Sequence, residues 1–283
     1  PGHWIKECPQ AGFNRSQQQQ QQTGDSRDGT RERGMQRSSQ QPPPPCWFCL
    51  SNPEVDKNLI VSIGTEVYMT MSKGQLPMTP SNLIPGGGHV ILITINHYPT
   101  FRAVEAEARK DLESELNKYK DGLQKLFQSK GAAMITWELS QGGRMQHAHV
   151  QVMAVPQDTV GDIERQFRED INQFFLPERP SRDQQPEEQQ QEESQPKHSA
   201  AWQDHLPSSE NVSFLKVELP DKVMVCPILE RQRVDPQFGR SVLAKALGIP
   251  DRANWRNCVK TAEDERKDSQ TFKLAFKSYD FTL

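Results

Sequence analysis

The stretch QHAHVQVMAVP, from Gln146 to Pro156, alternates polar and apolar residues in the way that predicts a β-strand. Side chains at every second position of a strand point to the same face, roughly 6.6 Å apart at a rise of about 3.3 Å per residue. His147, His149 and Gln151 should therefore form one polar row. The apolar residues expected on the opposite, buried face are Ala148, Val150, Val152 and Ala154.

The residues before this strand predict four further strands and a long helix. The runs 58–63 and 65–71 flank Gly64 as a hairpin, and a third apolar run covers 89–95. From Thr100 the apolar spacing changes to three or four residues, which predicts an amphipathic helix ending near Gly131. A strand over 134–139 then precedes the opening stretch. The stripe of this helix is Val104, Ala108, Leu112, Leu116, Tyr119, Leu123 and Leu126.

The residues after this strand continue the mixture of helices and strands. Ile163, Phe167, Ile171 and Phe174 predict a second helix, and strands are expected at 212–219 and 222–229. Helices are expected at 238–248 and from Thr261, as N-cap, to about 279. The sequence therefore predicts an α+β fold on a mainly antiparallel sheet, with a small C-terminal α+β domain packed on the first because its own core is thin.

Composition divides the 283-residue chain, of which only 34% is hydrophobic. A Gln run, four consecutive prolines and scattered Arg and Ser predict a disordered segment over 10–45, and an acidic Gln-rich linker is expected over 177–210. The expected domains are 46–176 and 211–283. Because the chain opens at Pro1 inside half a motif (residues 1–9), we expect a longer protein upstream.

Charge and hydropathy narrow the class of protein. The net charge is -3, and no segment alone is basic enough to predict nucleic-acid binding from charge. No apolar run approaches the roughly 18 to 20 residues of a membrane span, so no membrane partner is expected. Five cysteines, two of them in a Cys-x-x-Cys pair near histidines, favour metal binding in a reducing compartment over a disulfide framework.

The Cys-x-x-Cys pair is Cys46 and Cys49, whose thiolates can occupy adjacent corners of a zinc tetrahedron. A buried or redox-active pair is the alternative. His97 follows the third predicted strand and His147 begins the fifth, so two Cys and two His at the edges of predicted elements fit a closed structural zinc site. The site leaves His149 on the same strand face for other chemistry.

These residues, in the order Cys-x-x-Cys, GHVILITINHYPTF, long helix and His-x-His-x-Gln, resemble the histidine-triad superfamily, in particular its uridylyltransferase branch. The resemblance implies a histidine-triad-like sheet and zinc on Cys46, Cys49, His97 and His147. It also implies a nucleophile position at His149 and a phosphate contact from Gln151. A neutral imidazole can attack phosphorus and then leave, which divides one displacement into two steps.

Five separated blocks across residues 46–283, among them CWFCLSNPEVDKNLIVSIGTEVYMTMSKG, QFGRSVLA and YDFTL, are similar to the CwfJ family. This resemblance implies a nuclear, splicing-associated protein whose partners are intron-lariat or other spliceosomal RNA, the lariat debranching enzyme and post-splicing complexes. Some members carry a CCHC zinc knuckle, and PGHWIKEC supplies only its second half, His3 and Cys8.

Two functions follow from the resemblance: a non-catalytic RNA-processing factor, or an active nucleotidyl or phosphoryl hydrolase or transferase with His149 as nucleophile. Gln151 in place of a third His favours the first, although transferases also use Gln there. The roles of two further residues stay open. His89 lines a nucleotide pocket or is satisfied by backbone at the start of its strand, and Arg144 meets phosphate or lies in a solvated loop.

Overall fold

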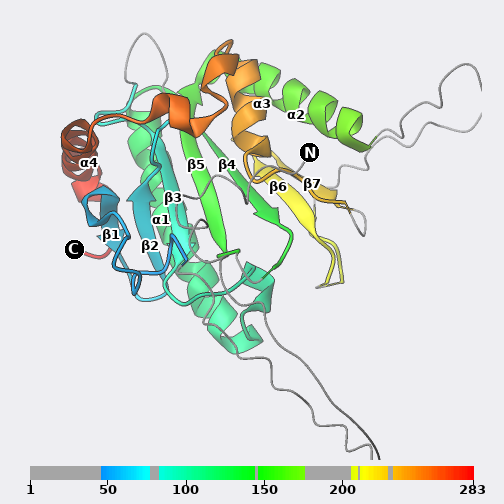
Figure 1. The fold of residues 1–283 in the computed structure, drawn as a ribbon, viewed down its shortest axis with the longest axis horizontal. Helices are drawn as coiled ribbons and strands as arrows, with labels where there is room; N and C mark the ends of the chain where they lie inside the picture. The colour runs from blue at the N-terminus through cyan, green and yellow to red at the C-terminus, as the bar shows by residue number, and fades with distance from the viewer. Residues whose placement is uncertain (1–45, 77–82, 144–145, 176–204, 210, 229–231) are drawn as a thin grey trace, which may run out of the picture. The chain divides into compact units, whose positions relative to one another are not determined.

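The computed structural model describes residues 46–76, 83–143, 146–175, 205–209, 211–228 and 232–283, and within these residues seven strands form one sheet (Figure 1). Their order is β1-β2-β3-β5-β4-β6-β7, and every neighbouring pair is antiparallel. The predicted tail, the knuckle remnant His3 and Cys8, Arg144, and the predicted linker apart from residues 205–209 lie outside the described residues. The strands are Ile60–Ile63 (β1), Val67–Met71 (β2), His89–Thr94 (β3), Ala132–Ser140 (β4), His149–Pro156 (β5), Phe214–Glu218 (β6) and Val223–Pro227 (β7).

The long helix α1, Ala106–Ser129, covers one face of the sheet. Four residues of its predicted stripe are fully buried there: Leu112, Tyr119, Leu123 and Leu126. It begins six residues later than expected, because a short 3-10 turn, Phe101–Ala103, precedes it. Ala108 was expected in the stripe but is exposed, since the first turn of α1 extends past the ends of the strands (Figure 1). Val150, Val152 and Ala154 of β5 pack in the same core, as predicted.

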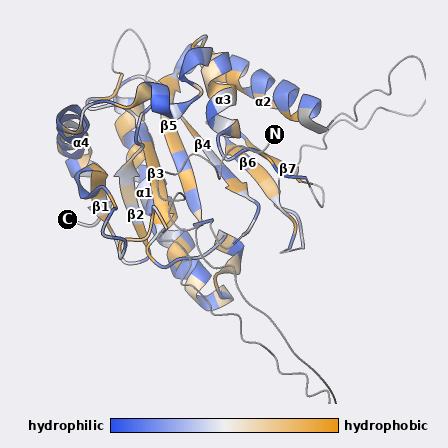
Figure 2. Cartoon of the chain, viewed as in Figure 1, coloured by the Kyte–Doolittle hydropathy of each residue, from blue (hydrophilic) through white to orange (hydrophobic). Residues whose placement is uncertain are grey.

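The opposite face of the sheet is covered by α2, Val160–Phe175, and α3, Phe238–Ala246 (Figure 1). Met153 and Val155 of β5 pack beneath these helices, so the second half of β5 is buried on both faces. Apolar residues accordingly fill the central strands and the inward sides of α2 and α3 (Figure 2). Within β5, the polar side chains are His149 and Gln151 at its start.

The C-terminal segment joins both layers of the molecule. β6 pairs with β4 and extends the same sheet, while α4, Ala262–Phe276, returns to the other face and packs Phe272 and Phe276 into the core of α1. The hydroxyl of Thr261 caps α4 by accepting the N–H of Asp264 at 3.1 Å, as predicted. Among the helices described, none has the length and apolarity that crossing a membrane requires.

Candidate metal centre and adjoining cavity

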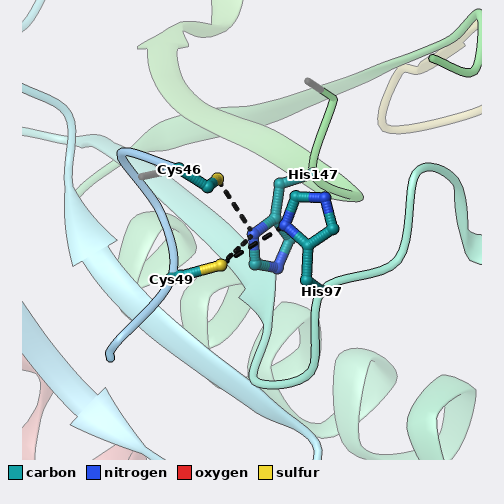
Figure 3. Close-up of side chains that lie close together, drawn as sticks. All are labelled: Cys46, Cys49, His97 and His147. Atoms are coloured by element: carbon teal, nitrogen blue, oxygen red, sulfur yellow. Dashed lines mark hydrogen bonds between the residues drawn. The ribbon is translucent and has the colours of Figure 1, made fainter. Parts of the chain in front are cut away.

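Two cysteines and two histidines from three separate segments meet at one end of the sheet (Figure 3). Cys46 and Cys49 lie in the turns before β1, His97 follows β3, and His147 precedes β5. One ligand atom from each side chain lies within 4.8 Å of all the others. Figure 3 shows both sulfur atoms and the two imidazole rings pointing toward one another. All four residues predicted as zinc ligands are thus brought together.

The distances within the cluster suit a tetrahedral ion. The Nδ1 atom of His147 lies 3.5 Å from Sγ of Cys46 and 3.7 Å from Sγ of Cys49, and Nδ1 of His97 lies 3.3 Å from Sγ of Cys49. A tetrahedral zinc ion with bonds of about 2.3 Å to sulfur and about 2.0 Å to nitrogen holds such atoms about 3.6 Å apart. The spacing therefore matches a zinc centre.

The ring of His147 is held in the orientation that a metal ligand needs. Its Nε2 lies 2.8 Å from the carbonyl oxygen of Thr94, which only accepts hydrogen bonds, so Nε2 carries the proton. Nδ1 then directs a lone pair at the two sulfur atoms. Burial lowers the pKa of His147 to about 4, which keeps the ring neutral. A second hydrogen bond of this kind commonly fixes a metal-binding imidazole.

The cysteine pair has the electrostatics of a site for a cation. Burial, reinforced by the neighbouring Cys46, raises the pKa of the Cys49 thiol to about 11. Two adjacent thiolates repel one another unless a positive ion lies between them. Sulfur and imidazole donors together favour zinc over calcium or magnesium, which prefer oxygen. The residues present therefore fit zinc.

Packing fixes the turn that carries the cysteines. The side chain of Asn52 donates to the carbonyl of Cys46 at 2.9 Å, and its backbone N–H donates to the carbonyl of Cys49, also at 2.9 Å. The hydroxyl of Tyr68, on β2, donates to the carbonyl of Phe48 at 2.6 Å. The turn is thereby anchored to the sheet even before a metal binds.

His149 lies beside this cluster with one nitrogen available. Its Nδ1–H donates to the carbonyl oxygen of His147 at 2.7 Å, which leaves the lone pair on Nε2. The ring of Phe48 lies 5.1 Å from the ring of His149, centroid to centroid. Burial lowers the pKa of His149. The imidazole is thus neutral and oriented, as a nucleophile or a hydrogen-bond acceptor requires.

Gln151 is oriented by His89. The backbone N–H of Leu76 donates to Nδ1 of His89 at 3.3 Å, so the proton of this neutral ring is on Nε2. Nε2 donates to the amide oxygen of Gln151 at 3.0 Å. The amide NH₂ of Gln151 is therefore left to donate elsewhere. The sequence left two roles for His89, in a nucleotide pocket or bonded to backbone. In the structure its ring is hydrogen-bonded to the backbone N–H of Leu76 and to Gln151, and the residue is 1% exposed.

A cavity of about 220 Å³ lies between the metal cluster, β4 and the start of α3. His149 and Gln151 both line it, whereas His89 lies behind Gln151 and does not. Phe48 and Trp137 give the cavity aromatic walls, and the ring of Trp47 at its rim is 76% exposed. A pocket that combines aromatic walls with a few convergent polar groups suits a small organic ligand.

Reasoning from the sequence gave no role to three residues of this site. Thr94 orients His147, Phe48 packs on His149, and Trp137 lines the cavity. Phe48 lies inside Cys-x-x-Cys, so its position was a signal that it would sit beside whatever the cysteines hold. Thr94 lies on β3 and Trp137 on β4, the two strands that flank β5. Their roles depend on the pairing register of these strands, which the sequence alone does not give.

Comparisons with known proteins agree on one family. A model described as protein similar to CwfJ C-terminal matches residues 33–168, and one described as protein similar to CwfJ C-terminus 2 matches residues 197–282. CWF19-like protein mug161 of Schizosaccharomyces pombe is 32% identical over 87% of this chain and 40% of its own length. Zinc finger CCCH domain-containing protein 64 of Arabidopsis thaliana is 34% identical over 83% of this chain and 35% of its own length. The chain thus spans well under half of these relatives.

Among solved structures, one described as uridylyltransferase aligns with 79% of this chain and 93% of its own, at 12% identity and a TM-score of 0.34. A score this low supports no conclusion about function.

Proposed function

The chain belongs to the CwfJ family, whose role is related to splicing, and from this premise we propose that it acts in the nucleus in the turnover of intron lariats. Its proposed partners are the lariat debranching enzyme, post-splicing complexes and the RNA itself. In this proposal the chain is an accessory factor that binds RNA phosphate and is not the catalyst.

The observation that carries the proposal is the convergence of the Cys/His cluster and the pair His149 and Gln151 on one cavity. The aromatic walls suit a nucleobase, because rings of Phe and Trp stack on unpaired bases in RNA recognition. The amide NH₂ of Gln151 is a donor for a phosphate oxygen. A ligand that presents both a base and a phosphate, as RNA does, satisfies both parts of the cavity.

We further propose that Cys46, Cys49, His97 and His147 hold a structural zinc ion. When bound, such an ion supplies folding free energy by tying distant segments together. The chain's own residues then do the remaining work. The cysteine turn places Phe48 against His149, and Thr94 keeps Nδ1 of His147 directed toward the sulfur atoms.

A catalytic function is the second candidate, and the geometry of His149 favours it. Its Nδ1–H is bonded to the carbonyl of His147, so Nε2 holds a lone pair. Attack by Nε2 on a phosphorus atom would form an N–P bond as the bond to the leaving oxygen breaks, and water would then release the phosphoryl group. Against this candidate, Gln151 stands in the place of a third imidazole and its amide oxygen is already occupied by His89.

One experiment separates the two functions. The purified chain is incubated with branched RNA and with nucleotide-capped RNA carrying a phosphorus label, and is then examined for a covalent adduct. For the accessory factor we expect binding of branched RNA and of the debranching enzyme, with no adduct and no turnover. An adduct that is lost in His149→Ala but kept in His205→Ala, an exposed histidine in the segment before β6, would establish the enzyme instead.

A further inference from the structure

A second cavity, of about 380 Å³, lies on the face of the sheet that α1 covers. α1 closes one side of it, and β4 and β6 supply its floor. β4 pairs with β5 only as far as Trp137, and its last three residues pair with β6 alone. The two cavities adjoin where this pairing ends, because Phe101 and Glu138 line both of them. The floor residues are Thr136, Glu138, Phe214, Lys216 and Glu218.

The segment before β6 covers this cavity. Arg102, which precedes α1, donates to the carbonyl oxygens of Pro207 and Ser209, both at 2.7 Å. Leu206 and Ser208 of the same segment line the cavity. Arg102 lies in the part of the chain matched by the first family model, and residues 205–209 lie in the part matched by the second. Both parts are therefore needed to enclose the cavity.

The cavity contains a hydrogen-bond acceptor without a partner. Among the described residues, Glu138 makes neither a hydrogen bond nor an ion pair. Its neighbour Glu218 is bonded to Lys120, Lys216 and the hydroxyl of Thr136, at 2.6, 2.5 and 2.8 Å. Glu138 is thus left to accept from a ligand.

The surroundings of Glu138 make its charge costly. Burial raises the pKa of this carboxyl to about 7, although the nearby charges of Lys216, Lys120 and Arg102 act to lower it. Glu218 adds to the increase. A ligand that donates hydrogen bonds to the ionised form replaces the missing hydration, so such a ligand is bound in preference to an acceptor.

The charge of the cavity argues against a cationic ligand. Two lysines share the single carboxylate of Glu218, and Arg102 is bonded to backbone carbonyls. A guanidinium group from a partner protein would meet this positive surplus. A neutral base that carries a phosphate fits it better. The charged residues that line the cavity are Arg102, Arg109, Lys120 and Lys216, with Glu113, Glu138 and Glu218.

Guanine is the RNA base that best matches Glu138. Its Watson–Crick edge presents two adjacent donors, N1–H and the exocyclic amino group, which match the two oxygens of one carboxylate. Adenine and cytosine place an acceptor beside their amino group, and uracil flanks its one N–H with two carbonyls. Phe101 and Phe214 supply aromatic rings, and the guanidinium of Arg102 lies 5.1 Å from the centre of the Phe214 ring.

We propose that the cavity between α1 and β6 is a second base site, which selects guanine through the carboxylate of Glu138. An RNA that places one nucleotide beside the metal cluster then places a neighbouring guanine here, because the two cavities adjoin at Phe101 and Glu138. The C-terminal segment takes part in ligand binding as the floor and cover of this site. This inference rests on the proposed function in one respect, that the chain binds RNA.

The test is calorimetric titration of the whole chain at pH 8 with 5′-GMP, 5′-AMP, 5′-IMP, which lacks the exocyclic amino group, and argininamide. GMP should bind at least tenfold more tightly than AMP or IMP, as expected for a hydrogen bond to a charged group. Glu138→Gln removes the charge and one acceptor, and should weaken GMP binding about tenfold while leaving AMP binding unchanged. Glu263→Gln, the same change at an exposed position of α4, should alter neither.

Two further measurements locate the site. Asn117→Trp places a bulky ring at an exposed position of α1 that lines this cavity and not the other, and should remove the preference for GMP. Gln128→Trp, on an exposed position of the same helix outside both cavities, should retain it. Because the ionised form of Glu138 accepts both bonds, the ratio of GMP to AMP affinity should be about tenfold lower at pH 6 than at pH 8.

Equal affinity for GMP and AMP, or a GMP preference that Glu138→Gln leaves intact, would overturn the inference. Tighter binding of argininamide than of GMP would also overturn it and would assign the cavity to a protein partner. Binding of branched RNA without any preference for GMP would contradict this inference alone. A GMP preference without binding of branched RNA would contradict the proposed function alone.

Discussion

At the scale of single residues, the site depends on buried imidazoles that stay neutral. His89 is the clearest example, because burial, with a contribution from the charge of Arg240, lowers its pKa to about 3. The sequence placed His89 at a strand start but left its partner open, since the partner depends on the pairing of β3 with β5. That register sets Ile91 opposite Gln151 and brings the side chains of His89 and Gln151 into contact.

The lowered pKa of His89 predicts acid sensitivity. The unfolded chain takes up a proton near the ordinary pKa of 6.5, whereas the folded chain does not until about 3. Because the unfolded state binds more protons in this window, the stabilisation is complete above about pH 6.5 and is lost as the pH falls toward 3. Between pH 7 and pH 5, the free energy of unfolding of His89→Gln should fall by about 2 kcal/mol less than that of the parent chain. Equal losses in urea titrations would disprove this.

At the scale of elements, α1 is bound to the first hairpin by a buried carboxylate, which the pattern of apolar residues did not predict. Glu115 lies within the helix at 8% exposure, and its carboxylate accepts the backbone N–H groups of Thr65, Glu66 and Val67 at 3.1, 3.0 and 2.8 Å. A Cβ on Gly64 would collide with the same carboxylate. Apolar spacing predicted the helix correctly because hydrophobic burial decides its face, but it gave no sign that a charged residue outside the apolar stripe is buried.

Removing this carboxylate should destabilise the fold. Glu115→Ala leaves three backbone donors of the hairpin turn without an acceptor, and we expect it to lower the free energy of unfolding by about 3 kcal/mol. Glu113→Ala, on the exposed side of the same helix, should change it by less than about 0.5 kcal/mol. Urea denaturation of both variants measures the difference, and similar values for the two would show that the contacts contribute little.

At the scale of the whole molecule, the two segments matched by the family models share one sheet, and both contribute to the core on each of its faces. The strands, helices and Thr261 cap were predictable from local patterns. The pairing of β6 with β4 and the return of α4 to α1 were not, because contacts between residues far apart in sequence leave no periodic signal. The zinc ligands were predictable because Cys and His are the residue types that bind zinc. The contact of Trp137 with Gly239 was not predictable, because these residues come from different segments that meet only in the folded chain.

This shared core predicts cooperative unfolding. Phe272 in α4 is fully buried against α1, so Phe272→Ala should lower the free energy of unfolding by about 3 to 5 kcal/mol. It should shift a single transition that is seen alike by tryptophan fluorescence and by circular dichroism. Leu274→Ala, on the same helix but 76% exposed, should shift it little. Two separate transitions, of which only one responds to Phe272→Ala, would show that the segments fold independently.

The zinc centre is the central claim, and X-ray absorption at the zinc edge of the purified chain tests it most directly. We predict about one zinc per chain, bound by two sulfur atoms at about 2.3 Å and two nitrogen atoms at about 2.0 Å. The metal should be lost in Cys46→Ser and kept in Cys226→Ser, which alters a buried thiol in β7. A shell of oxygen ligands, or a zinc content that Cys46→Ser leaves unchanged, would contradict the account.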